Sequence, residues 1–191
     1  MNEAYMSHAA VFLINAVAGI FLVLVLVRLI LQLVRADFHN PVSQFVVKAT
    51  NPVLRPLRRV IPGWGGLDLA SVLLLVAVQM LALFLIYMAM GKAISLSGLF
   101  VLSIAELLSL TFNFFLVTIL FQVILSWIGP GTYHPVTALL YSLNDILLRP
   151  AQRIIPPFSG IDLSPLVVLI VIQLLKILIV APITNLGLSL G

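Results

Sequence analysis

The sequence predicts an all-α membrane protein of two tandem parallel repeats, each with two transmembrane helices joined by a short interfacial amphipathic helix and a Pro/Gly corner. Of 191 residues, 62% are hydrophobic and only 8% are charged, whereas a soluble domain has about 25% charged residues. Apolar stretches of more than about 18 residues recur, and each can cross a bilayer as a helix. The chain also contains an internal repeat.

The repeat has a period of 94 residues, the difference between positions 55 and 149. The run 55–69 matches the run 149–163, with Arg-Pro, Ile-Pro and Asp-Leu at corresponding places. The same offset pairs Gln79 with Gln173. Because the register holds without a gap, we expect one unit at 1–94 and a second at 95–191. The expected spans are about 9–34 and 67–90, then about 104–128 and 162–185, with a linker at 91–103.

Each pair of spans is connected by a segment that begins with Asn40-Pro41 or His134-Pro135. A capping residue followed by Pro at the first helical position is typical of a helix start. After Pro135 the apolar residues recur at helical spacing. The expected helix of about 11–15 residues extends only about 16–22 Å, so it is too short to span and fits an interfacial position.

A Pro/Gly-rich corner follows each short helix, and we expect its prolines to interrupt the helix: Pro56, Pro62, Pro150, Pro156 and Pro157. Asp68 and Asp162 come next, at the entrance to the second span of each copy. Their carboxylates can accept hydrogen bonds from the free N–H groups of the helix start.

The distribution of positive charge predicts the orientation. Seven of the ten Lys and Arg residues lie in the two connectors: Arg35, Lys48, Arg55, Arg58, Arg59, Arg149 and Arg153. The positive-inside rule therefore places both connectors in the cytoplasm and both termini outside it. We expect a multi-pass membrane protein. The positive charges are expected to meet anionic lipid headgroups, and no nucleic acid partner is predicted.

The pattern Arg-Pro-x-x-Arg-x-Ile-Pro, followed after a Gly-rich stretch by Asp-Leu-Ser-Pro, resembles the YggT family of bacterial membrane proteins, which has plastid relatives. Leu125-Ser126-Trp127 precedes the second copy of the pattern, which carries Asp162-Leu163-Ser164-Pro165 intact. The first copy departs from it, with Asp68-Leu69-Ala70-Ser71. The resemblance implies a small non-enzymatic inner-membrane protein connected with osmotic stress tolerance, membrane organisation or complex assembly.

The corner supplies the first candidate site, for a lipid or a protein partner, made of two Arg and one Asp in each copy: Arg55, Arg59, Asp68, Arg149, Arg153 and Asp162. Two interpretations remain open for each type. The Asp residues either cap a helix and pair with Arg, or take part in binding or conduction. The Arg residues either set the topology and contact headgroups, or form a specific docking site.

Polar residues inside the spans form a second candidate group, because such residues are costly in lipid. The group comprises Arg28, Gln79, Glu106, Gln173 and Lys176. Arg28 is within reach of Asp68 in the expected fold. Lys176 and Glu106 either extend to the outer interface, pair with each other, or line a pore. The two Gln residues, at matching depth, are expected to hydrogen-bond between helices.

The sequence gives no indication of catalysis or of a cofactor. It has no Cys, and His8, His39 and His134 do not have the spacing of a metal site. No phosphate loop or nucleophile motif is present. Two classes of function remain: a scaffold or assembly factor, and an ion or small-solute conduit. Four spans enclose little interior, so a conduit requires a homo-oligomer, and self-association is expected in either case.

Overall fold

The computed structural model describes residues 2–128, 134–155 and 162–191, and all regular secondary structure in these ranges is helical. The helices are α1 (Asn2–Leu33), α2 (Pro41–Val60), α3 (Leu69–Ala89), α4 (Leu96–Ile128), α5 (Pro135–Ile154), α6 (Ser164–Leu175), the π-helix η1 (Lys176–Val180) and α7 (Ala181–Leu190).

Four stretches are long and apolar enough to cross a membrane: Tyr5–Leu33, Leu69–Ala89, Leu96–Trp127 and Ser164–Leu190. The predicted all-helical chain with four apolar spans is therefore confirmed. The last stretch contains α6, η1 and α7 as one continuous helical path. Its π-turn, closed by a hydrogen bond from the Ala181 N–H to the Lys176 carbonyl, lies directly before Pro182, which has no N–H to continue an α-helical ladder.

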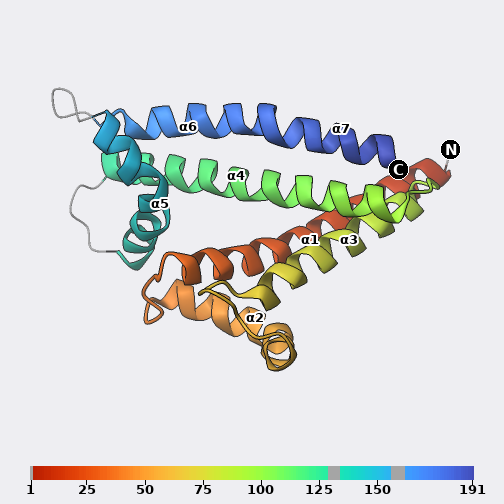
Figure 1. Cartoon of the computed structure of the whole chain (residues 1–191), viewed down its shortest axis with the longest axis horizontal. Coiled ribbons are helices and arrows are strands. Elements are labelled where there is room, and N and C mark those ends of the chain that lie inside the picture. Colours follow the sequence, from red (N-terminus) through yellow and green to blue (C-terminus); the bar gives the residue numbers. More distant parts are fainter. Residues whose placement is uncertain (1, 129–133, 156–161) are drawn as a thin grey trace.

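The long helices lie with both chain termini at one end and with α2 and α5 at the other (Figure 1). Helix α1 packs along α3, α3 along α4, and α4 along α6 and α7. Close approach of α4 and α7 depends on glycine. A Cβ added at Gly98 would lie 2.9 Å from Gly191 Cα, and one at Gly187 would lie 2.7 Å from Leu102 Cγ. Small residues are what allow such backbone approach between membrane helices.

Helix α4 begins eight residues before the expected start near residue 104, because Ser95 caps it. The Ser95 Oγ accepts a hydrogen bond from the Gly98 N–H at 3.0 Å and donates one to the Leu190 carbonyl. Residues 96–103, which were expected in the linker, are thus the start of the third span.

Helices α2 and α5 have the predicted caps. The Asn40 Oδ1 accepts a hydrogen bond from the Val42 N–H at 2.9 Å, and His134 Nδ1 accepts one from the Val136 N–H at 3.3 Å. A proline follows each cap at the start of the helix. The capping prediction is therefore confirmed.

The prediction that prolines interrupt these helices is wrong for Pro56 and Pro150. Both lie inside regular helix, as does Pro52. Each of α2 and α5 has 20 residues rather than the roughly 11–15 expected, so it is their polar and charged composition, and not their length, that separates them from the four apolar spans. All three prolines are exposed. The carbonyls that they leave without a helical donor therefore lie on the outer side of the helix, where another donor can reach them. Pro156 and Pro157 are outside the described residues.

The core lies toward the end of the molecule that carries α2 and α5. One buried cluster joins Leu22, Val25, Leu26, Ile30 and Leu31 of α1 to residues of α2, α3 and α5. Leu139 and Leu143, on the apolar face of α5, belong to this cluster, so α5 of the second copy packs against the first copy. A second cluster joins Ile119, Leu148, Val168 and Ile172.

Candidate functional site

Asp68, directly before α3, connects that helix to α2 in the first copy. Arg58 near the end of α2 donates to Asp68 Oδ2 from Nη2 and, at 3.1 Å, from Nε. The Ser71 hydroxyl donates to the same oxygen. The Asp68 side chain is 5% exposed, and burial disfavours its charged form. The hydrogen bonds from Arg58 and Ser71 outweigh burial and hold the pKa of the carboxyl below its usual value.

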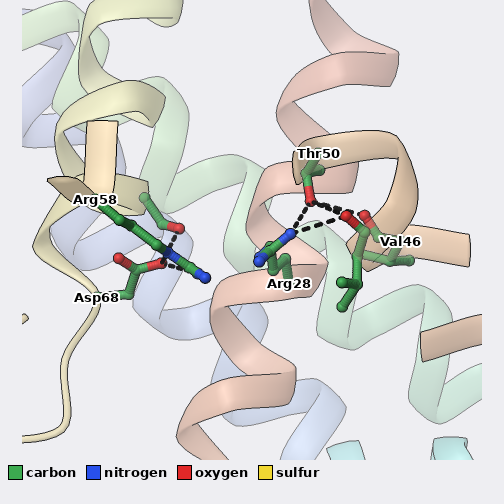
Figure 2. A network of polar contacts seen from close by, with 7 residues as sticks. Arg28, Val46, Thr50, Arg58 and Asp68 are labelled. Carbon is green, nitrogen blue, oxygen red and sulfur yellow. Dashed lines mark hydrogen bonds and ion pairs between the residues drawn. The ribbon is translucent and has the colours of Figure 1, made fainter. Parts of the chain in front are cut away.

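Arg28 connects α1 to α2. It is 5% exposed, and its Nη1 donates to the Thr50 Oγ1 at 2.7 Å and to the Val47 carbonyl at 3.0 Å. The Thr50 hydroxyl in turn donates to the Val46 carbonyl at 2.7 Å. Figure 2 shows this contact beside the Arg58–Asp68 pair. The sequence placed Arg28 within reach of Asp68, but its hydrogen bonds go to α2.

The second copy has a polar contact at each corresponding place. Gln152 Nε2 donates to Asp162 Oδ2 at 2.9 Å, and the Ser164 N–H donates to Asp162 Oδ1 at 2.8 Å. Burial opposes ionisation of Asp162, but the hydrogen bonds from Ser164 and Gln152 keep the pKa of its carboxyl below the usual value. Between α4, the first long helix of the second copy, and α5, Asn144 Nδ2 donates to Gln122 Oε1 at 2.8 Å.

The two sets of contacts obey the 94-residue offset. Residues 28, 50, 58 and 68 correspond to residues 122, 144, 152 and 162. Each copy therefore fastens its short helix to both of its long helices at the same two points. The first copy uses two arginines where the second uses two glutamines, so positive charge is concentrated in the first copy.

The predicted corner residues are distributed differently from expectation. Arg55 and Arg59 are exposed, and Arg58, which the sequence reasoning did not select, holds Asp68. Arg149 pairs with Asp145 on its own helix rather than with Asp162. Arg153 is exposed and, with Arg149 and Asp145, lines a surface pocket of about 300 Å³.

The capping interpretation holds for one Asp only. Asp162 accepts a backbone N–H at the start of α6, whereas Asp68 makes no side-chain cap hydrogen bond and is held by Arg58 and Ser71. The residue after each Asp-Leu pair is Ser164 in one copy and Ala70 in the other.

Two of the pairings considered for the polar residues within the spans are not made. Lys176 Nζ donates to Asn113 Oδ1 at 2.6 Å rather than to Glu106, which is exposed. The part of the chain that the structure describes shows no hydrogen bond for Gln79 or Gln173, and Gln173 is exposed on α6. The predicted bond between helices is therefore not made within one described chain.

A cavity of about 400 Å³ adjoins the two arginine contacts of the first copy and is lined by Arg28, Gln32, Phe38, Arg58, Gly63 and Asp68. Its polar walls come from α1, α2 and the start of α3. Within residues 2–128, 134–155 and 162–191, no group of three or more His, Asp and Glu side chains has the arrangement of a metal site.

These features define a class: a four-span membrane protein of two repeats, each with a short basic helix bonded to its spans. The CCB3/YggT family model matches residues 7–89 and again residues 101–183, two segments that begin 94 residues apart. The chain belongs to the CCB3/YggT family.

Relatives of the chain come from several bacteria. A Pseudomonas aeruginosa protein described as uncharacterized is 41% identical over 177 residues, which cover 92% of this chain and 90% of that protein. YggT of Escherichia coli K12, also described as uncharacterized, is 36% identical over 167 residues and 86% of each chain. A Vibrio alginolyticus protein is 39% identical over 164 residues, 85% of this chain and 88% of that protein. No solved structure matches.

Proposed function

We propose that this protein is a non-enzymatic scaffold of the bacterial inner membrane, which supports membrane organisation or complex assembly and tolerance of osmotic stress. One observation carries the proposal: in both copies, side-chain hydrogen bonds fasten the short helix to both of its long helices. A surface fixed at two points keeps its shape when a partner binds, which lowers the entropic cost of recognition. Such a surface suits docking rather than chemistry.

The proposed orientation places α2 and α5 at the cytoplasmic headgroups and both termini outside the cytoplasm. Lys and Arg are concentrated in the connectors, and cytoplasmic segments carry this excess in membrane proteins. The charged faces of α2 and α5 then meet anionic headgroups or an acidic segment of a partner.

The lateral faces of the spans support association with another membrane protein or a second copy. In the most apolar window of each span, only 11% to 28% of the residues are buried within the chain. The rest contacts lipid or a neighbour. Gln173, exposed on α6, favours a neighbour because a polar side chain is costly against lipid tails.

The orientation is testable with single cysteines, because the chain has none of its own. His8, Gln44 and Ser142 are exposed and suit replacement, whereas Ser43 is fully buried and does not. With an impermeant thiol reagent on spheroplasts, His8→Cys should react, and Gln44→Cys and Ser142→Cys should react only after lysis. The reverse pattern would contradict the proposed placement of the docking surface.

The scaffold role is tested by osmotic survival of a strain that carries the gene with Arg55→Gln and Arg59→Gln, which removes exposed charge without touching the buried contacts. We expect reduced survival at unchanged protein abundance. The alternative, an oligomeric conduit, predicts ion or solute flux from liposomes that contain the purified protein. Flux above that of empty liposomes would favour the conduit and contradict the proposal of a scaffold.

A further inference from the structure

We propose that the cavity between Arg28 and Arg58 binds the phosphate group of one anionic phospholipid. The site belongs to the first copy alone and is distinct from the exposed arginines of the docking surface. It rests on the proposed function in one respect, because it requires α2 to lie at the depth of the headgroups.

The charge on Arg28 is the first argument. Arg28 is 5% exposed, and among the described residues no carboxylate lies within ion-pair distance of it. Its partners, Thr50 and the Val47 carbonyl, are neutral, and both are bonded to Nη1. A buried charge without a directly bonded counter-ion is unfavourable. An anion that reaches the remaining N–H groups would compensate it.

The geometry of the donors is the second argument. Figure 2 shows the other edge of the Arg28 guanidinium turned toward the side where Arg58 and Asp68 lie. The cavity of about 400 Å³ opens there, with the Gln32 amide as a further donor. Guanidinium groups bind phosphate with two parallel N–H bonds. Arg28 keeps its Nη2 and Nε groups for such a pair of bonds, whereas Arg58, whose Nε and Nη2 are bonded to Asp68, can add its Nη1 group.

The local charge balance favours an anion. Asp68 is the only acidic residue that lines the cavity, and it is already occupied by Arg58 and Ser71. A second cavity of about 560 Å³ also borders Arg28 and Phe38 and is lined on its other side by Lys48. Two arginines therefore line the site against one carboxylate, and the neighbouring cavity adds the positive charge of Lys48.

The depth of the site selects a lipid as the source of the phosphate. Arg28 lies on the last two turns of α1, about 7 Å along the helix from its end at Leu33. It is level with α2, and the exposed faces of α1 and α3 extend from there toward the termini. Basic pockets between membrane helices on the cytoplasmic side are typical sites for anionic headgroups.

The second copy provides the comparison within the same chain. It has Gln122 and Gln152 at the places of Arg28 and Arg58 and satisfies them with Asn144 and Asp162. The contact between Gln122 and Asn144 joins two neutral amides and needs no counter-ion. One lipid per chain is therefore expected, not two.

The test measures stabilisation of the detergent-purified chain by phosphatidylglycerol, with phosphatidylcholine and inorganic phosphate as the other additions. Phosphatidylglycerol should raise the melting temperature of the wild type, and native mass spectrometry should show one tightly bound lipid. Arg28→Gln and Arg58→Gln each introduce the second copy's residue and should weaken the apparent affinity about tenfold, because a charge-assisted hydrogen bond is lost.

Arg55→Gln is the matched control: it removes the same charge from the exposed docking surface, so it should weaken only the diffuse binding of further lipids and leave the one tightly bound lipid as in the wild type. Equal weakening in Arg55→Gln would show diffuse attraction and overturn the site. Equal stabilisation by inorganic phosphate would overturn the lipid as its occupant. If Arg28→Gln does not fold, Arg58→Gln decides, and wild-type affinity in that variant overturns the proposal.

The outcome is separable from that of the proposed function, because binding in detergent does not depend on orientation. If no lipid binds in detergent while Gln44→Cys is labelled only after lysis, the lipid site is excluded and the scaffold proposal stands. If the lipid binds but Gln44→Cys is labelled from outside, the lipid site stands and the proposed placement of the scaffold is excluded.

Discussion

At the scale of single residues, one position in each element decides the charge of the contact, here called a joint, between a short helix and a long helix. Residue 58 or 152 meets the aspartate before the second span, and residue 28 or 122 meets the short helix. Arginine at these places lets a buried joint carry positive charge, whereas glutamine completes the same bond as a neutral donor or acceptor. The two copies thus share a framework and differ in electrostatics.

The Arg58–Asp68 joint should be more sensitive to loss of the acid than to loss of the charge on the base. Asp68→Ala leaves Arg58 and Ser71 without their acceptor and should lower the free energy of unfolding by about 2 kcal/mol. Arg58→Gln retains a donor, as Gln152 does beside Asp162, and should cost less. Thermal unfolding of both variants in the same detergent measures the difference. Equal loss would mean that the geometry of Gln152 cannot form in the first copy.

The same joint predicts a pH dependence. Because the pKa of Asp68 is lower in the folded protein than its usual value, its contribution to stability is present above the unfolded pKa of about 4 and is lost as pH falls through the folded value. The stability advantage of the wild type over Asp68→Asn should therefore be complete near neutral pH and shrink below about pH 4. A constant difference between the two melting curves across that range would contradict this assignment.

The sequence could indicate that Arg58, and not Arg55 or Arg59, faces Asp68 only if α2 was taken to continue as a helix through Pro56. The buried residues of α2 are Ser43, Val46, Thr50 and Leu54, at spacings of three and four. Arg58 continues that stripe by one further turn, whereas Arg55 and Arg59 lie beside it. The repeat favours Arg55 and Arg59 instead, because both recur as Arg149 and Arg153 in the second copy, whereas Arg58 corresponds to Gln152.

At the scale of elements, the short helices are packed components rather than loose surface segments. Leu139 and Leu143 of α5 are 6% and 3% exposed and share a core with α1. The apolar periodicity after Pro135 predicted which residues point inward. It could not predict that the opposing surface belongs to the other copy, because packing between units leaves no mark on the period of either one.

Leu143 offers the sharpest test of this packing. Leu143→Asp places a charge in the shared core and should destabilise the chain by about 3 kcal/mol or more, whereas Ser142→Asp, next to it and exposed, should change stability little. Yield of monodisperse protein and the melting temperature report the difference. If both variants melt like the wild type, α5 does not pack as described.

At the scale of the whole molecule, the four spans and the repeat were predictable because each is a strong and repeated signal. Long apolar runs can satisfy their backbone only as helices in lipid, and the 94-residue offset fixes which segments are equivalent. The close approach of α4 and α7 depends on Gly98 and Gly187, which occur far apart in the sequence. Nothing in either local pattern pairs them.

Self-association is the prediction that belongs to this scale. Gln173→Cys, exposed on α6, should yield covalent dimers with a short bismaleimide in membranes, because a second copy can cover the glutamine that the single chain leaves open. Leu73→Cys, on α3 and 52% exposed, should give far fewer. A monodisperse monomer in nanodiscs, with no preference between the two positions, would exclude this interface.

The divergence of the long helices has a mechanical consequence. They are gathered near the termini and spread apart toward α2 and α5 (Figure 1). With the four apolar helices across a bilayer, as their length and composition allow, we expect the broad end to fall in one leaflet. A wedge displaces more lipid from the leaflet at its broad end, and the bilayer lowers the cost of that mismatch by bending. That leaflet becomes convex. We therefore expect the protein to collect where the membrane already bends that way.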